Sequence, residues 1–377
     1  MQDYGQKKFS PNICVTHRCN LNCVYCYQKH DTVGRMSIAT AKRCIDWIFA
    51  NIPDNSNSVE IDFIGGEPLL EFDLIKDVVN YTVNKNISIP YIFFATTNGT
   101  VLSTNMKKYF SDNKDIFWLG LSIDGGKQTQ DNNRSNSFDK IDVDYFLKNW
   151  PHQSIKMTLS EYSLNHLYDD VVYLHSLGIE DISGANLAEG NINWDKDAYL
   201  KILSYQLSKL VEYYVNNEKL QPFMLLDKRL DLCEAKPERT KWCGVGAGTP
   251  FFDIDGKKYP CPFITTMTFP DNDLQNILKY DFNNINNFID EKCYKECYLY
   301  PICPNCSGSN YLANKDFKIR NKNKCKIQKL VSLYIADLQA KRILKNPSVF
   351  ESEQLYYTIE AIKNIKNLYL NEYKEFI

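Results

Sequence analysis

Segments of strand length alternate with segments of helical periodicity through the first half of the chain, and this alternation constrains the fold most. Six strands are expected, over residues 10–16, 59–64, 91–97, 117–123, 154–160 and 181–187. Helices are expected between them, over 37–51, 71–86, 102–111, 141–149 and 164–177. Strands that alternate with helices form parallel sheets, so the fold class is α/β. Six units are too few for a closed eight-stranded barrel, and the prediction is an open, partial (β/α)6 barrel of the TIM type.

The second half of the chain has a different pattern. Residues 195–235 are amphipathic and helical, residues 251–261 are typical of a β-hairpin with Asp255 and Gly256 at its turn, and the tail is helical. The predicted parts are a barrel, a helical bridge, a small cysteine-rich domain and a helical tail, over residues 1–190, 191–240, 241–330 and 331–377.

Composition excludes several classes of function. The net charge of -2 and pI near 6.3 give no general polyanion-binding signal, so nucleic acid is not an expected partner. The longest apolar runs are far shorter than a membrane span, and the first twelve residues are too polar for a signal peptide. The sequence therefore predicts a cytoplasmic protein that does not enter a membrane.

The 13 cysteines are unusual for such a protein, because cytoplasmic thiols stay reduced and clustered ones more often hold metal than form disulfides. Three lie between residues 19 and 26, and eight lie between residues 233 and 325. Cys14 and Cys44 are isolated in apolar surroundings, and Cys44 is expected to be a small core residue.

Cys19, Cys23 and Cys26 stand at C-x-x-x-C-x-x-C spacing directly after the first predicted strand. A structural zinc usually has a fourth protein ligand close by, and none is obvious among Cys14, His17 and His30. A 4Fe-4S cluster held by three thiolates leaves one iron open for an outside ligand. A zinc knuckle is the alternative.

This loop resembles the signature of radical S-adenosylmethionine (SAM) enzymes, C-x-x-x-C-x-aromatic-C, with Tyr25 as the aromatic residue. The resemblance implies that the three cysteines hold the catalytic cluster and that Tyr25 contacts adenine. Gly65, Gly66, Glu67 and Pro68 follow the second strand and resemble the family's GGEP motif. In that motif, glycine lets the backbone approach the methionine end of SAM, and the acid helps to position its ammonium group.

Four more residues resemble family positions that line the ribose and carboxylate of SAM: Asn98, Ser122, Asp124 and Arg134. A guanidinium pairs bidentately with a carboxylate, which favours Arg134 most. Each of the four is equally compatible with a turn or a solvated charge, because Asn, Asp and Ser favour strand-to-helix turns for local reasons.

The cysteine-rich segment resembles the SPASM extension of radical SAM enzymes, which carries two auxiliary 4Fe-4S clusters. The seven cysteines that carry this resemblance are Cys243, Cys261, Cys293, Cys297, Cys303, Cys306 and Cys325. By position, one cluster would take Cys293, Cys297, Cys303 and Cys325, and the other would take Cys243, Cys261 and Cys306. The run reads C-x3-C-x5-C-x2-C where the family has C-x2-C-x5-C-x3-C, which weakens the assignment of Cys297 and Cys306.

Seven cysteines divide as four plus three, so one cluster lacks a protein ligand. Cys233 or a non-cysteine group could supply it, or the site could stay open for a substrate thiolate. The apolar spacing of residues 225–233 predicts a helix, on which a buried thiol is usually a packing residue. Two four-ligand zinc sites are the alternative, and they need Cys233 or a histidine as an eighth ligand.

The resemblance also bears on the substrate. Anaerobic sulfatase-maturating enzymes have an aspartate directly after the cysteine that corresponds to Cys261, and here that residue is Pro262. This departure favours the peptide-modifying members, which make thioether or carbon-carbon crosslinks in ribosomally made precursor peptides. Sulfatase maturation is the alternative, and a non-catalytic electron-transfer protein is a third. The motifs that resemble SAM contacts disfavour the third.

Partners other than the precursor peptide are also expected. Only 18 residues precede Cys19, too few for the N-terminal leader-binding domain of several such enzymes, so any leader recognition is expected to use another surface or a separate leader-binding protein. Residues 316–329 carry six cations around Cys325: Lys318, Arg320, Lys322, Lys324, Lys326 and Lys329. They form either a solvated charged face or a docking surface for an acidic flavodoxin or ferredoxin that donates electrons.

Overall fold

The computed structural model describes residues 8–28, 34–189, 192–235, 238, 241–246, 249–347 and 351–377. The chain forms two compact units, each assembled from separate stretches. Unit 1 comprises residues 1–122, 134–153 and 244–287, and unit 2 comprises residues 123–133, 154–243 and 288–377.

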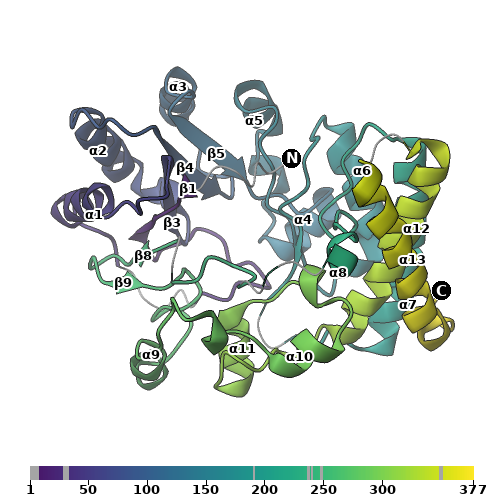
Figure 1. The fold of residues 1–377 in the computed structure, drawn as a ribbon. Coiled ribbons are helices and arrows are strands. Elements are labelled where there is room, and N and C mark those ends of the chain that lie inside the picture. The colour runs from purple at the N-terminus through teal and green to yellow at the C-terminus, as the bar shows by residue number, and fades with distance from the viewer. Residues whose placement is uncertain are drawn as a thin grey trace. The chain divides into compact units, whose positions relative to one another are not determined.

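Unit 1 is built on one sheet with strand order β5-β4-β3-β2-β8-β9, and β1 also pairs with β3 (Figure 1). The strands are β1 (Lys8–Phe9), β2 (Asn12–Thr16), β3 (Ser58–Gly65), β4 (Tyr91–Thr97), β5 (Phe117–Leu121), β8 (Phe251–Phe252) and β9 (Lys258–Tyr259). All neighbours are parallel except β8 and β9. The first four predicted strands and the parallel sheet are therefore confirmed.

The helices of unit 1 are α1 (Ile38–Ala50), η1 (Pro68–Glu71), α2 (Phe72–Val83), α3 (Thr104–Asp112), η2 (Phe138–Lys140), α5 (Val143–Asn149), α9 (Asp271–Ile277) and η4 (Ile285–Asn287). Four of them, α1, α2, α3 and α5, form where the periodicity predicts helices, whereas α9 and the short η segments were not predicted. The hydroxyl of Ser37 accepts a hydrogen bond from the Thr40 amide and caps α1. Cys44 lies on the buried face of α1 with 3% of its surface exposed, as expected of a core residue.

The predicted hairpin is present as β8 and β9. The Asp253 amide donates to the Lys257 carbonyl, and Gly256 takes the positive φ of +84° that the turn requires. Its position in the sheet was not predicted. β8 pairs in parallel with β2, with Asn12 opposite Phe251, so the hairpin extends the sheet that bears the three-cysteine loop.

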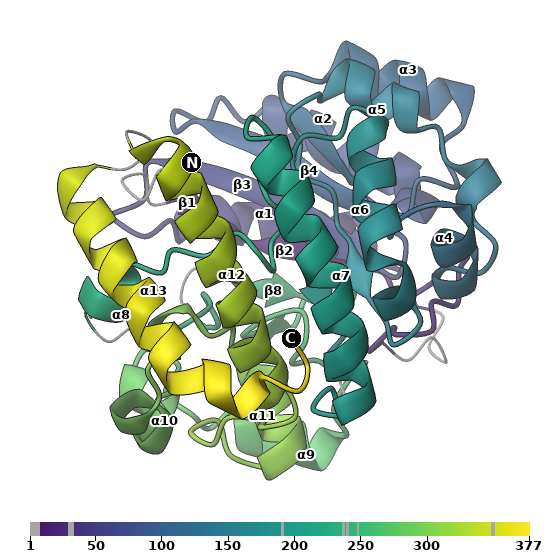
Figure 2. The ribbon, with the colours of Figure 1, turned by 90° about the vertical axis from the view of Figure 1, so that its right-hand side faces the viewer.

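Unit 2 is mainly helical. Its elements are α4 (Lys127–Asn133), β6 (Thr158–Leu159), η3 (Ser163–His166), α6 (Leu167–Ser176), β7 (Asn186–Leu187), α7 (Asp197–Asn216), α8 (Leu232–Ala235), α10 (Glu291–Glu296), η5 (Tyr300–Ile302), α11 (Ser307–Asn314), α12 (Cys325–Lys345) and α13 (Ser352–Tyr373). Figure 2 shows α12 packed between α7 and α13. Leu200, Leu203 and Leu207 on the predicted stripe of α7 are fully buried.

Two predictions of regular structure in unit 2 are only partly correct. The last two strands have two residues each, because side chains take the hydrogen bonds that a ladder would use: Ser154 Oγ accepts from the Gly184 amide and lies 2.9 Å from Ser183 Oγ. The prediction of a helix over residues 225–233 is wrong except at its end, where α8 begins. Within this range the Gln339 amide group donates to the Lys228 carbonyl, so this backbone is bonded by α12.

None of the helices in the described ranges is long and apolar enough to cross a membrane.

Asp170 on α6 is a buried acid of unit 2. Its carboxylate accepts from the Gly126 amide at 2.9 Å and from the Thr129 hydroxyl at 2.6 Å. Burial raises the pKa of Asp170 to about 7, and the two hydrogen bonds only partly oppose this rise.

A raised pKa means that the folded state binds the Asp170 proton more tightly than the unfolded state does. Its contribution to stability is therefore present below pH 4 and is lost as the pH rises toward 7. At ~1.4 kcal/mol per pKa unit the loss is at most about 4 kcal/mol. Asp170→Asn keeps the shape and should flatten the fall in unfolding free energy between pH 5 and 8, measured by denaturant titration. The matched variant at exposed Asp169, Asp169→Asn, should keep most of the fall, and equal slopes for D170N and wild type would contradict the assignment.

Candidate active site

The three-cysteine loop begins where β2 ends and is fixed to the end of β3. The Gly66 amide donates to the Thr16 carbonyl at 3.1 Å, and the Glu67 amide donates to the Arg18 carbonyl at 2.9 Å. Within the loop, the Cys26 amide donates to the Cys23 carbonyl at 3.0 Å. Burial raises the pKa of the Cys19 thiol, and the nearby charges of Glu67 and Cys26 add to the rise.

Glycine is required at residues 65 and 66 because the loop passes directly over them. A Cβ atom on Gly66 would lie 2.4 Å from the Arg18 carbonyl oxygen and 2.9 Å from Cys19 Cβ. A Cβ atom on Gly65 would lie 2.3 Å from the Thr16 carbonyl oxygen. The GGEP segment is therefore a close-packed support for Cys19, in addition to the role that the resemblance implies.

Glu67 lies in the centre of the hydrogen-bond network and is 1% exposed. Its carboxylate accepts from the Leu69 amide, from the Thr97 hydroxyl at 2.8 Å and from the Asn98 amide at 2.8 Å. Burial raises the pKa of Glu67 to about 7, and these hydrogen bonds oppose the rise. The carboxylate thus joins the end of β3 to the end of β4.

Asn98 links this network back to the cysteine loop. Its side-chain amide donates to the side chain of Asn20 at 2.9 Å, and Asn20 in turn donates to the Thr100 hydroxyl at 2.8 Å. Thr100 completes the ring, because its hydroxyl donates to Asn98 Oδ1 at 2.7 Å. Sequence reasoning did not assign roles to Asn20 and Thr100. Their position beside Cys19 and Asn98 was the available signal.

Arg134 lies on the other side of the loop and is 6% exposed. Its guanidinium carbon is 5.4 Å from the centre of the Tyr25 ring, and its charge lowers the pKa of both Cys26 and Glu67 against the larger effect of burial. The next residue, Ser135, accepts a hydrogen bond from the Asn22 amide at 2.9 Å. The structure therefore brings Arg134, Tyr25 and the cysteines together.

The remaining residues predicted to contact SAM have these positions. Pro68 is the first residue of η1, and Ser122 lies just after β5 with its amide donating to the Thr97 carbonyl. Asp124 belongs to unit 2 and is fully buried, with its carboxylate accepting from the Thr158 amide and from the Asn133 side chain. Contact of these residues with SAM stays a prediction.

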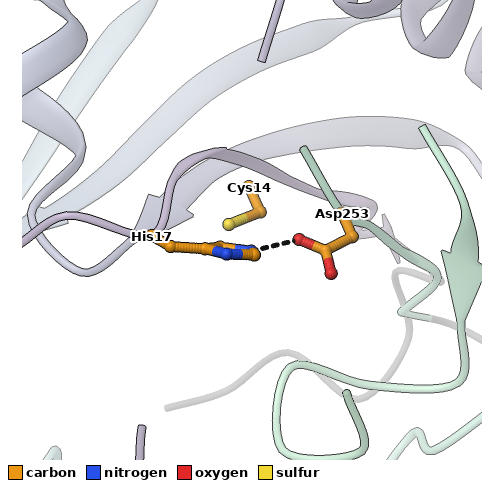
Figure 3. A group of neighbouring side chains, drawn as sticks. All are labelled: Cys14, His17 and Asp253. Carbon is orange, nitrogen blue, oxygen red and sulfur yellow. Dashed lines mark hydrogen bonds and ion pairs between the residues drawn. The ribbon is translucent and has the colours of Figure 1, made fainter. Parts of the chain in front are cut away.

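A second group of polar side chains lies behind the cysteine loop and was missed from the sequence. Cys14, His17 and Asp253 are buried, and their ligand atoms lie within 4.8 Å of one another (Figure 3). His17 Nε2 is 2.5 Å from Asp253 Oδ1, although the two residues are 236 positions apart. His17 Nε2 and Asp253 Oδ1 are engaged in this hydrogen bond, and burial keeps the Cys14 thiol protonated by raising its pKa. We interpret the group as a structural pair that ties the segment before Cys19 to the hairpin.

Removing Asp253 should destabilise unit 1, because the buried His17 would lose its hydrogen bond to Asp253. Asp253→Ala is expected to lower the free energy of unfolding by about 3 kcal/mol. The matched control is Asp255→Ala, since Asp255 is exposed two residues further along the same hairpin. Denaturant unfolding of the apo protein measures both, and equal losses in the two variants would show that the pair is unimportant.

The cysteines of unit 2 form the second candidate site. Four of them interact electrostatically: Cys293, Cys297, Cys303 and Cys325. This is the set predicted for one auxiliary cluster. The other predicted set divides between the units, with Cys243 and Cys306 in unit 2 and Cys261 in unit 1, and it stays a prediction.

Cys293 and Cys297 line a cavity of about 860 Å³ within unit 2. Cys293 is held on both sides: its amide donates to Asp290 at 2.9 Å, and Lys322 Nζ lies 2.8 Å from its sulfur. Burial raises the pKa of the Cys293 thiol, and the Lys322 contact opposes this rise.

The basic segment around Cys325 is largely paired with acids or sulfur. Lys324 contacts Glu189 at 2.7 Å, Lys326 contacts Asp197 at 3.5 Å, and Lys329 contacts Glu372 at 3.3 Å. With Lys322 engaged at Cys293, four of the six cations bind the segment to the rest of unit 2.

Tetrahedral zinc with bonds of about 2.3 Å places sulfur ligands about 3.8 Å apart. Across the described ranges, no three cysteine sulfurs lie within 4.8 Å of one another. Among the described residues, no three cysteines are therefore arranged as a ready-made site for one tetrahedral ion.

Residues 13–144 match the family model described as "Radical SAM superfamily". An uncharacterized protein of Methanocaldococcus jannaschii is 30% identical over 256 residues, which cover 66% of this chain and 82% of that protein. The fold is similar to that of native anSMEcpe, an anaerobic sulfatase-maturating enzyme solved with AdoMet and the Kp18Cys peptide. The TM-score is 0.67 and the sequence identity is 18%, and the match covers 89% of this chain and 99% of that chain. The fold is also similar to that of Streptococcus suis SuiB bound to precursor peptide SuiA. The TM-score is 0.56 and the sequence identity is 16%, and the match covers 84% of this chain and 75% of that chain.

Proposed function

Since the chain belongs to the radical SAM superfamily, we propose that it modifies a ribosomally made precursor peptide. The proposed reaction removes hydrogen from a side chain or backbone carbon of the peptide and closes a thioether or carbon-carbon crosslink. The observation that carries the proposal is the three-thiol loop packed on Gly66 and joined through Asn20 and Asn98 to Glu67.

In this proposal, Cys19, Cys23 and Cys26 hold three irons of a 4Fe-4S cluster, and the fourth iron is open to SAM. When bound and reduced, the cluster and SAM together supply a 5′-deoxyadenosyl radical. Arg134 is placed to pair with a carboxylate, and Tyr25 offers a ring to adenine. Glu67 keeps Asn98 oriented through its bond to the Asn98 amide.

The two auxiliary clusters are proposed at the seven cysteines of the second half. The Cys293, Cys297, Cys303 and Cys325 thiols are gathered in unit 2, which supports one of them. Their proposed roles are to accept the surplus electron or to bind a substrate thiolate. The further partners proposed are an acidic flavodoxin or ferredoxin as electron donor and a separate leader-binding protein.

Sulfatase maturation is the second candidate, favoured by the similarity of fold to anSMEcpe. Pro262 disfavours it, because proline in place of the family's aspartate after Cys261 cannot act as a base. A non-catalytic electron-transfer protein is disfavoured by the network around Glu67 and Arg134, since electron transfer alone does not need it.

Mass spectrometry of peptide products separates these functions. The reconstituted protein is incubated anaerobically with SAM, a reductant and cysteine-containing peptides from genes adjacent to its own. A crosslink removes two hydrogens and keeps sulfur, whereas formylglycine formation from cysteine replaces sulfur with oxygen. Formylglycine would contradict the crosslinking proposal, and an absence of 5′-deoxyadenosine would contradict radical chemistry.

A further inference from the structure

Cys233 lies in the same cavity as Cys293 and Cys297, although it is separated from them by about 60 positions. It is the second residue of α8 and is 2% exposed. The packing of α8 against η5 and α13 positions it there. Cys233 is therefore a fifth thiol beside the four-cysteine set of unit 2.

Hydrogen bonds hold Cys233 close to Cys297. Glu234, the residue after Cys233, accepts from the hydroxyl of Tyr298, the residue after Cys297. The same carboxylate oxygen accepts from the Asn364 side chain of α13 at 2.7 Å. The backbones that carry the two cysteines are thus joined through their next residues, and α13 fixes the junction.

The electrostatic interactions of Cys233 also involve Cys297. Burial raises the pKa of Cys233 to about 12, and the nearby charges of Glu234 and Cys297 add to the rise, so the uncoordinated thiol keeps its proton. Tyr369 of α13 is close enough to interact with Cys233, Cys297 and Cys303 together. All three thiols therefore lie near Tyr369.

We propose that Cys233 is a reserve ligand of the metal centre at Cys293, Cys297, Cys303 and Cys325, and that it replaces Cys297 when that thiolate is lost. The inference rests on the auxiliary cluster of the proposed function. Cys297 is the ligand most easily replaced, because it lies at the C-terminal end of α10 and the C-x3-C spacing places it one residue beyond the family position.

The exchange balances without an oxidant or reductant. When residue 297 offers no thiolate, Cys233 would bind the iron in its place. The S–H bond of Cys233 breaks and its proton passes to solvent, since metals bind the thiolate form. Cys293 need not move, because Asp290 and Lys322 hold it.

The test compares anaerobically reconstituted wild type with Cys297→Ala, Cys233→Val and the double variant. Iron and sulfide are counted per chain, and electron paramagnetic resonance reports each cluster. Wild type and both single variants should hold about twelve irons, and C297A/C233V should hold about eight. Valine fills the site of the buried thiol but offers no ligand.

Cys297→Ala combined with Cys44→Val is the matched control, because Cys44 is a similarly buried thiol in unit 1. It should keep about twelve irons. Cleavage of SAM and far-ultraviolet circular dichroism verify that each variant is folded. Loss of about four irons from C297A alone, loss from C233V alone, or full iron in C297A/C233V would each overturn the reserve role.

Failure of the auxiliary clusters themselves has a different signature. A wild-type protein with about four irons and two zinc ions would contradict the proposed clusters. Zinc counted in the same variants would still decide whether Cys233 can replace Cys297.

Discussion

Replacing Cys19, Cys23 and Cys26 together with alanine is expected to abolish cleavage of SAM to 5′-deoxyadenosine. The three thiols are the only proposed protein ligands of the catalytic cluster, and without them no iron is held beside Gly66 and Arg134. The auxiliary clusters should remain, because their ligands lie beyond residue 240. Chromatography of 5′-deoxyadenosine after anaerobic reduction, with iron counted per chain, measures both effects.

Cys44→Ala provides the control for this experiment, since Cys44 is a core thiol of α1 and no cluster ligand. It should cleave SAM as wild type does. A triple variant that still released 5′-deoxyadenosine would place the radical chemistry elsewhere in the chain.

The second large effect is expected from one added methyl group. Gly66→Ala would put a Cβ atom 2.4 Å from the Arg18 carbonyl oxygen and 2.9 Å from Cys19 Cβ, and neither neighbour is the end of a flexible side chain. The loop must then move away from β3, which displaces Cys19 from the other two thiols. We expect loss of about four irons and of SAM cleavage, with about eight irons retained.

Gly126→Ala is the matched substitution, because the nearest atoms to its added Cβ are 3.8 Å away. It should keep full iron and full SAM cleavage. If G66A also kept both, the close packing of the loop on the GGEP segment would not be needed for the cluster.

The sequence predicted those parts of the molecule that depend on local pattern. β3 was placed to within one residue because apolar residues alternate there, and leucines at helical spacing indicated α7. The cysteine loop and Gly66 were found because they lie at fixed distances along the chain.

What the sequence did not predict depends on contacts between distant residues. Nothing near His17 indicates that Asp253 is its partner, and nothing near β2 indicates that β8 pairs with it. The segment before α8 has apolar spacing, yet its Lys228 carbonyl is bonded by Gln339 of another helix. A hydrogen bond to the Ser154 side chain, 30 residues away, also replaces a strand hydrogen bond at Gly184. Side chains from elsewhere decide these cases, and periodicity does not record them.

The pairing of β2 with both β3 and β8 has a consequence for the order of synthesis. β2 carries the cysteine loop at its end, but one of its two neighbours is made only after residue 250. The bond from His17 to Asp253 is likewise absent until then. Contacts of such long sequence separation form late in folding. A nascent chain therefore exposes Cys19, Cys23 and Cys26 on an unfinished sheet while more than 200 further residues are translated, and stable insertion of the catalytic cluster must follow emergence of the hairpin from the ribosome.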